Sequence, residues 1–274
     1  PPLPVAKADP WVSDICRPWW EKAEWGFVYA GRVLVSAVDE NGVYQAVELG
    51  YGDIWYFPEG VAHTVSGLGD ENEFLLVFDD GDFDRAGTTF NIDDWIAHTP
   101  KDILAKNFGV DPSVFDDVPK PPPYILNGTV SDGDVSDLPD SNAHGDASFV
   151  YRTFEHPPEK IAGTGGEFRK IDSTNFPISK TIAATFVTLK PGALRELHCT
   201  QREYFTPASQ AHIYMRIGVV PFGGPLTLTF ASQAEEWLYF HQGQAQATVF
   251  TGNTNARTFD FSAGDTAVFP DNSG

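Results

Sequence analysis

Residues 52–63 read GDIWYFPEGVAH, and a related stretch near the carboxyl end, residues 264–270, reads GDTAVFP. Both stretches begin with Gly-Asp and contain Phe-Pro at the same spacing, and they lie 212 residues apart. Other identities at the same offset are Glu24-Trp25 with Glu236-Trp237, and Gly31 with Gly243. Because no gap is needed across these matches, we infer that the chain carries two copies of one unit, one near each end.

Each copy consists of short apolar or alternating runs separated by turn residues. In the first copy these runs are Phe27-Val28-Tyr29, Val33-Leu34-Val35 and residues 54–57. In the second copy they are Leu238-Tyr239-Phe240, residues 247–250 and Phe259-Asp260-Phe261. Glycine-rich turns divide the runs, which is typical of a β-sandwich or β-barrel. We therefore predict an all-β fold.

The region between the copies has a different pattern. Acidic residues precede Trp95-Ile96-Ala97, and residues 100–109 have Pro at the start and Gly at the end, so we expect two short helices. A Pro-rich linker follows. The predicted division is an N-terminal unit with an incomplete start, a linker with an exposed loop, and a truncated C-terminal unit, at residues 1–110, 111–148 and 149–274.

The charge of the chain excludes several classes of function. There are 18 basic and 38 acidic residues, a formal net charge of −20 and a pI near 4.5. Such a surface repels phosphate backbones and anionic membranes, so we expect neither nucleic acid nor membrane as a partner. No run of about 18 apolar residues is present, as a membrane-spanning helix would require.

The most specific motif is Gly52-x5-Pro58-x-Gly60-x2-His63. A glycine turn, a strand and a Pro-x-Gly turn would place His63 on the following strand, facing the interior of a barrel. Glu24 lies on an earlier strand. An imidazole nitrogen and a carboxylate oxygen inside a barrel suit manganese, iron or another divalent ion. The alternative interpretation is a surface acid and a packed histidine.

This motif resembles the second motif of the cupin superfamily, and Glu24-x6-Gly31 resembles the end of the first. Longer stretches are similar to bicupin oxalate decarboxylases, over most of the chain except roughly 1–20 and 200–232. They are residues 22–25 (KAEW), 52–58 (GDIWYFP), 73–81 (EFLLVFDDG), 95–101 (WIAHTPK), 190–198 (KPGALRELH) and 244–250 (QAQATVF).

The resemblance implies two cupin jelly-roll barrels, a bicupin, with short helices between them. It also implies one manganese per barrel, held by three His and one Glu, and a substrate-orienting Arg three residues before the first His. The implied reaction converts oxalate to formate and carbon dioxide with dioxygen as co-catalyst. An acidic residue on a lid donates the proton in bacterial members; Asp84 is the nearest acid here.

Carried over residue by residue, the resemblance assigns four metal ligands. They are Glu24 and His63 in the first copy, and His198 and Glu236 in the second. Arg195 corresponds to the substrate-orienting arginine, and its guanidinium would grip a carboxylate bidentately. Three of the four remaining ligand positions hold other residues, Pro18 and Trp20 in the first copy and Thr200 in the second, and the fourth would be position 275, one past Gly274. Ile15 stands at the other arginine position.

Residues 200–232 separate His198 from Glu236 by about 30 residues more than the family pattern allows. We expect this segment to displace the ligands and to break a barrel strand. Our preferred hypothesis is a translated intron or mis-joined exon in a chain truncated at both ends. The alternative is a genuine but degenerate cupin that binds metal poorly.

The sequence therefore predicts a manganese-dependent oxalate decarboxylase-type enzyme, secreted and homo-oligomeric, with oxalate as the small-molecule partner. Two alternatives stay open. One is oxalate oxidase on the same scaffold, a choice that depends on the lid. The other is a non-catalytic storage or binding bicupin, which the missing ligands favour.

Overall fold

A computed structural model of the chain describes residues 22–81, 92–118, 125, 140–159, 163, 165–195, 216–218, 226–232, 235–250 and 255–269. Within these ranges the chain is mostly β-strand, with few and short helices. None of the helices in the described ranges is long and apolar enough to cross a membrane. The predicted all-β class, with short helices between the two copies, is confirmed.

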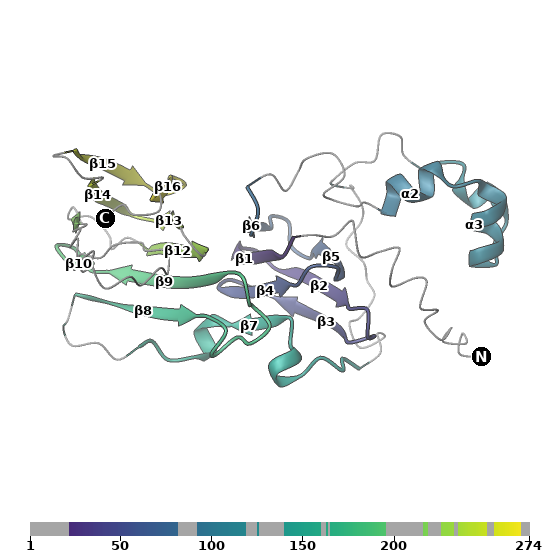
Figure 1. The fold of residues 1–274 in the computed structure, drawn as a ribbon, viewed down its shortest axis with the longest axis horizontal. Coiled ribbons are helices and arrows are strands. Elements are labelled where there is room, and N and C mark those ends of the chain that lie inside the picture. Colours follow the sequence, from purple (N-terminus) through teal and green to yellow (C-terminus); the bar gives the residue numbers. More distant parts are fainter. Residues whose placement is uncertain are drawn as a thin grey trace, which may run out of the picture.

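The first copy, called the first repeat here, forms two antiparallel sheets (Figure 1). One sheet has the order β6-β1-β4-β7 and the other β3-β2-β5. The strands are β1 (Glu24–Ala30), β2 (Val33–Val38), β3 (Tyr44–Leu49), β4 (Asp53–Phe57), β5 (Ala62–Gly67), β6 (Glu73–Phe78) and β7 (Val150–Arg152). β7 follows the linker in the sequence, so the helices α2 and α3 lie between it and the other strands of this sheet along the chain.

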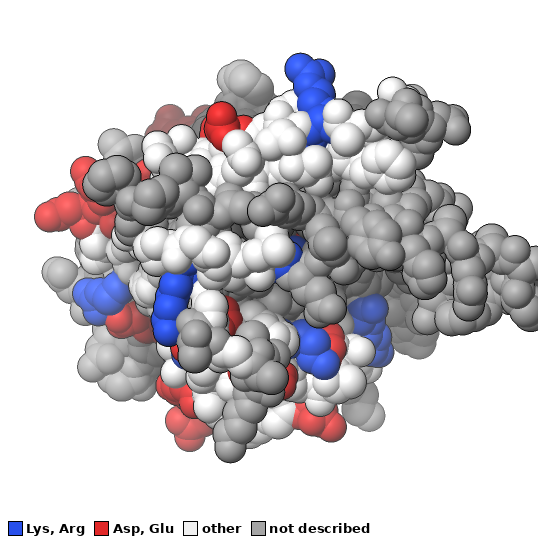
Figure 2. Space-filling model, turned by 90° about the vertical axis from the view of Figure 1, so that its left-hand side faces the viewer, with Lys and Arg blue, Asp and Glu red and all other residues white. Residues whose placement is uncertain are grey.

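The second repeat also has two antiparallel sheets, with orders β16-β13-β12-β9-β8 and β10-β11-β14-β15. Its strands are β8 (Gly166–Ile171), β9 (Ala183–Leu189), β10 (Leu194–Arg195), β11 (Arg216–Gly218), β12 (Leu226–Ser232), β13 (Glu235–Gln242), β14 (Gln244–Phe250), β15 (Ala256–Ser262) and β16 (Thr266–Phe269). Figure 2 looks onto this side of the molecule and shows acidic and basic side chains interspersed on it.

The offset of 212 residues seen in the sequence is reproduced in strand pairing. Glu24 lies opposite Phe57 in the first repeat, and Glu236 lies opposite Phe269 in the second. The turn before β4 repeats as well. Gly52 and Gly264 have φ angles of 87° and 90°, a region that favours glycine. The internal repeat is therefore a structural repeat over four strands, β1–β4 and β13–β16, which pair in the same register.

The helices between the repeats are short. α2 spans Ile92–His98 and α3 spans Lys101–Phe108, followed by the 3₁₀ turns η1 (Pro112–Phe115), η3 (Gly145–Ala147) and η4 (Thr153–Glu155). Gly109 ends α3 in the left-handed conformation at φ 68°, and its N–H donates to the Ala105 carbonyl. The predicted glycine stop is confirmed, and the helices project from the first repeat (Figure 1).

Alternation along each strand divides the buried residues among three clusters. In β1, Val28 faces the interior of the first barrel, whereas Trp25 and Phe27 face the second repeat. In β13, Leu238 and Phe240 line the interior of the second barrel. The strand period of two therefore gives each barrel its own core and adds a shared core between the barrels.

The contact between the repeats has approximate twofold symmetry. Phe27 contacts His241 with 6.3 Å between ring centroids, and Tyr29 contacts Tyr239 at 6.1 Å. Positions 27 and 239 are equivalent in the repeat, as are 29 and 241, so the two contacts exchange under a twofold rotation. Tyr29 and His241 lie 5.6 Å apart where such an axis would pass.

The described part of residues 200–232 contributes two strands to the second barrel. β12 is hydrogen-bonded to both β9 and β13, with Phe230 opposite Ala184 on one side and Trp237 on the other. We expected this segment to interrupt a strand, and that expectation is wrong for β12, because its backbone groups are satisfied within the sheet. The domain boundaries themselves stay predictions.

Candidate functional site

Glu24 and His63 meet inside the first barrel. Glu24 begins β1 in one sheet and His63 lies on β5 in the other, and Glu24 Oε2 is 3.4 Å from His63 Nε2. Their side chains are only 14% and 23% exposed, respectively. The structure thus brings together the two residues that the motif spacing singled out. Their role as metal ligands stays a prediction.

Three neighbours fix this pair. Trp55 donates from Nε1 to Glu24 Oε1 at 3.0 Å, and the Phe57 ring stacks on the His63 ring with 4.1 Å between centroids. Gly26 makes room for the Trp55 indole, because a Cβ at residue 26 would lie 2.1 Å from Trp55 Cε2. Sequence analysis did not assign these roles. The signal was the alternation in β4, which places Trp55 and Phe57 on the same face.

The ring of His63 is oriented by the backbone. Its Nδ1 lies 2.9 Å from the Val61 carbonyl oxygen, so Nδ1 carries a proton and Nε2 faces Glu24. Burial lowers the pKa of His63, but hydrogen bonding to Glu24, its negative charge and the Val61 carbonyl outweigh burial, and the net pKa is raised. A neutral His63 would present a lone pair at Nε2, as a metal ligand does.

The equivalent carboxylate in the second repeat has a different partner. Glu236 is 4% exposed and accepts a hydrogen bond from Arg195 Nη1 to its Oε1 at 2.5 Å. Arg195 lies on β10 and Glu236 on β13, so this ion pair also joins the two sheets of its barrel. Arg195, predicted to hold oxalate, is here placed against the predicted metal ligand.

The described residues provide only part of the manganese site that the resemblance implies. Glu24 and His63 supply one oxygen and one nitrogen, both aimed inward, which suits a divalent ion. No group of three or more His, Cys, Asp or Glu suited to a metal occurs within the described ranges. His198, Thr200, Pro18, Trp20, Ile15 and Asp84 lie outside those ranges. The described donors therefore do not make a complete manganese site.

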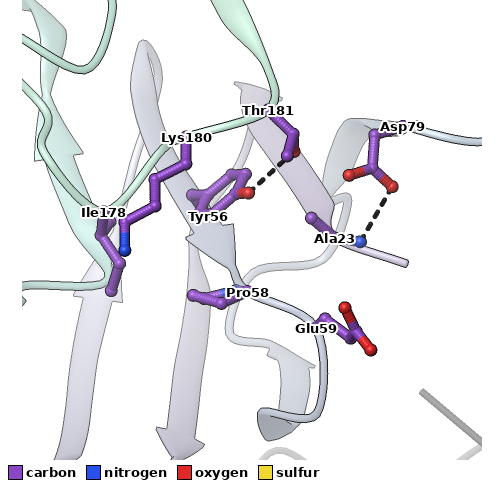
Figure 3. Close-up of a pocket in the computed structure, with 8 residues that line it drawn as sticks. All are labelled: Ala23, Tyr56, Pro58, Glu59, Asp79, Ile178, Lys180 and Thr181. Atoms are coloured by element: carbon purple, nitrogen blue, oxygen red, sulfur yellow. Dashed lines mark hydrogen bonds between the residues drawn. The ribbon is translucent and has the colours of Figure 1, made fainter. Parts of the chain in front are cut away.

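A pocket of about 220 Å³ lies outside the first barrel, where the connection before β9 crosses β1 and β4 (Figure 3). Tyr56 forms its floor and is hydrogen-bonded to Thr181 across 2.9 Å. Tyr56 and Ala23 belong to the cluster between the repeats, whereas Trp55 and Phe57 face the barrel interior. The pocket is therefore on the opposite face of the sheet from the Glu24–His63 pair.

A family model described as "Cupin" matches residues 15–115 and 201–274. The chain belongs to the cupin family. The second match begins at residue 201, so it includes the segment 201–232 that we had set apart from the family pattern. The bicupin expectation and the resemblance to oxalate decarboxylases are confirmed by the relatives of this cupin.

Among curated proteins, the chain is 48% identical over 256 residues to a "Probable oxalate decarboxylase" of Arthroderma benhamiae. That match covers 93% of this chain and 55% of the relative. Oxalate decarboxylase OxdC of Bacillus subtilis is 38% identical, over 92% of this chain and 57% of the relative. The chain thus spans little more than half the length of these relatives.

Solved structures give the same result. The structure of Bacillus subtilis oxalate decarboxylase at pH 4.6 matches with a TM-score of 0.71 and 36% identity, covering 92% of this chain and 58% of that one. Another match, also with TM-score 0.71 and 36% identity, comes from a study of the Mn(II) centres of the same enzyme. The bicupin fold is therefore shared with this enzyme.

Proposed function

We propose that this cupin derives from a manganese-dependent oxalate decarboxylase, an enzyme that converts oxalate to formate and carbon dioxide with dioxygen as co-catalyst. The observation that carries the proposal is the meeting of Glu24 and His63 across the two sheets of the first barrel. The names of the relatives support the choice of substrate.

In the first repeat, Glu24 and His63 would hold the metal, and in the second repeat His198 and Glu236 would do so. Manganese, when bound, would supply a Lewis acid for a substrate carboxylate. Trp55 holds the Glu24 carboxylate by a hydrogen bond, and Phe57 and the Val61 carbonyl hold the His63 ring.

A second candidate is a non-catalytic bicupin. The Arg195–Glu236 ion pair favours it, because this arginine neutralises a carboxylate that a metal would need. Oxalate oxidase on the same scaffold is the third candidate. A decarboxylase releases formate in nearly equal amount to the oxalate consumed, whereas an oxidase produces hydrogen peroxide, so product analysis separates these two.

The test begins with metal content. With two protein donors per repeat, a divalent ion stays mostly water-bound, so we expect well under one manganese per chain and no oxalate turnover. The double variant Pro18→His/Trp20→His restores two nitrogen donors in the first repeat and should gain manganese by elemental analysis. Adding Glu24→Gln to that variant should remove the gain.

Two outcomes decide against parts of the proposal. Stoichiometric manganese in the unmodified chain would show that a complete site already exists, with donors in addition to Glu24, His63, His198 and Glu236. Failure of the restored variant to gain metal, with its β-structure intact by circular dichroism, would favour the non-catalytic bicupin.

We also propose that the protein is secreted and homo-oligomeric, on the strength of the family resemblance alone. Detection in the medium rather than in cells of the source organism would test secretion. Light scattering of the purified full-length protein would test the oligomeric state.

A further inference from the structure

The strand beside β1 in the first repeat has an irregular register. β6 runs antiparallel to β1, with Phe74 opposite Val28. The next pair is Glu73 with Ala30, so the register passes over Tyr29. An extra residue of this kind is a β-bulge, which bends and twists a strand at a defined point. The place of the bulge is therefore a marker for the strand that pairs with β1.

The pairing of β12 with β13 in the second repeat has the same bulge. Thr227 lies opposite Phe240, and the next pair is Leu226 with Gln242, so the register passes over His241. The repeat counterparts of Phe240, His241 and Gln242 are Val28, Tyr29 and Ala30. The extra residue is thus the same one in both repeats, and β12 stands to β13 as β6 stands to β1.

The match extends along the whole pairing. Six consecutive residues, 226–231, lie where β6 has residues 73–78, one for one. The offset of 212 residues would put the counterpart of β6 at positions 285–290, past Gly274. In the described residues this place beside β13 is instead taken by a strand that precedes β13 in the sequence, between β13 and β9 (Figure 1).

The sequences of β6 and β12 agree at the positions next to the second core and differ at a position next to the barrel. Leu75 and Val77 pack against the core between the repeats, and β12 has a leucine and a phenylalanine at these register positions. Phe74 packs against the core of the first barrel, whereas β12 has Thr227 at that position. A strand with the β6 sequence therefore offers more apolar surface for burial at this position than β12 does.

β12 pairs through its main chain on both of its edges. Thr229 lies opposite Leu238 of β13 on one side and opposite Thr185 of β9 on the other. Buried main-chain groups need hydrogen-bond partners, so β9 and β13 would each lose a ladder of bonds without β12. The strand thus joins β9 and β13 into one sheet.

We propose that β12 is a permuted closing strand, which takes the β6 place in the second repeat and can be replaced there by a strand of β6 sequence. The main chain supplies the pairing for either strand, and the alternate side chains set the preference. In the intact chain β12 keeps the place because its covalent attachment gives it an effective concentration on the order of millimolar. This role of β12 rests on strand register, so it is independent of the proposed reaction.

The first experiment weakens β12 in the full chain. Thr229→Pro removes a main-chain donor from a strand that is paired on both sides, where proline is not accommodated. Hydrogen–deuterium exchange at residues 183–188 and 236–240 should become about tenfold faster or more, and exchange at residues 24–28 should not change. Thr258→Pro is the matched control, because β15 is at the edge of the other sheet, and it should leave all three ranges unchanged.

The second experiment supplies the replacement strand. A synthetic peptide of residues 72–79 (NEFLLVFD), added to the Thr229→Pro variant, should slow the exchange at residues 236–240 again, and the effect should saturate with peptide concentration. A scrambled peptide of the same composition should have no effect. The same concentration of the native peptide should leave the unmodified chain unchanged, because β12 holds the place in cis.

Each result decides for or against the proposal. Unchanged exchange at residues 236–240 in Thr229→Pro would show that β12 does not close the sheet. Faster exchange that neither peptide reverses, or that both reverse equally, would show that the place has no preference for a strand of β6 sequence.

A further variant covers the case in which Thr229→Pro unfolds the whole chain and also speeds exchange at residues 24–28. Thr227→Phe leaves the β12 main chain intact and gives it the residue that β6 has at the same register position. Exchange at residues 236–240 should then be about fivefold slower than in the unmodified chain, because more apolar surface is buried in the second barrel. Unchanged or faster exchange in this variant would contradict the assignment of β12 to the β6 place.

Discussion

Glu24 and Glu236 occupy the same place in two copies of one barrel, yet they have different partners. Both lie at the start of a strand, and each is opposite a phenylalanine of the matching strand. Glu24 faces His63, whereas Glu236 accepts a hydrogen bond from Arg195. Duplication has thus preserved the backbone register while the chemistry across the barrel has diverged.

The two pairs differ in how permanent their charges are. Arginine stays protonated at every pH a protein tolerates, whereas histidine is neutral or charged according to its surroundings. The first repeat can therefore release its carboxylate to another partner by losing one proton from His63. The second can do so only by moving Arg195. The Glu24 carboxylate in the first repeat can therefore change its partner more readily than the Glu236 carboxylate in the second.

The largest expected effect comes from breaking the second pair. Glu236→Gln removes the carboxylate charge that accepts from Arg195 Nη1 at a buried position, so the free energy of unfolding should fall by about 3 kcal/mol. Glu24→Gln should cost about 1 kcal/mol, because the amide oxygen still accepts from Trp55. Urea unfolding of both variants measures the difference.

A double-mutant cycle is the control for that comparison. Arg195→Gln combined with Glu236→Gln should be more stable than the two single losses would predict, because the two side chains interact and their losses are therefore not additive. Additive losses in the cycle would mean that the two side chains do not stabilise each other.

A second comparison concerns the volumes of the side chains at equivalent cross-strand positions of the two repeats. The cross-strand pair Gly26–Trp55 in the first repeat corresponds to Leu238–Ala267 in the second, so the large side chain has moved from one strand to the other. Gly26→Ala should cost about 2 kcal/mol, because the new Cβ would collide with the Trp55 indole. Thermal unfolding measures it, with Gly42→Ala as a control free of neighbours but strained at φ 76°.

Much of this arrangement was predictable from the sequence. The repeat, the strand runs and the Gly52-to-His63 spacing are enough to predict that Glu24 and His63 lie on facing strands. The partner of Glu236 was not predictable, because Arg195 lies on a two-residue strand whose direction depends on the whole barrel. The cover by β7 was also missed, since residues 149–152 were assigned to the other unit, and strand pairing ignores that boundary.

A smaller effect should follow from removing the indole donor beside Glu24. Trp55→Phe keeps the ring on the inner face but leaves Glu24 Oε1 without the 3.0 Å hydrogen bond, a loss of about 1 kcal/mol. Trp237→Phe, in a half-exposed tryptophan of the second repeat, should change stability by less than about 0.5 kcal/mol. Equal losses in the two variants would mean that general packing, not the Glu24 hydrogen bond, determines the effect of Trp55.

The smallest effect concerns the approximate twofold axis, where Tyr29 of the first repeat meets His241 of the second. Burial among the rings of Phe27, Tyr29 and Tyr51 lowers the pKa of His241 below its ordinary value of 6.5. The unfolded chain therefore binds a proton at this position more readily than the folded chain does. His241 accordingly contributes its full share of stability above about pH 6.5, and this share is lost as the pH falls through the folded pKa.

His241→Tyr gives both repeats the same residue on the axis and removes the titration, so the difference in unfolding free energy between wild type and variant should shift in favour of the variant below pH 6.5. Urea unfolding of both proteins at pH 7.5, 6.0 and 5.0 measures this difference, because the titration of every other group is largely common to the two. A difference that does not change with pH would show that His241 binds protons equally in the folded and unfolded chains, and that the interface between the repeats tolerates its charge.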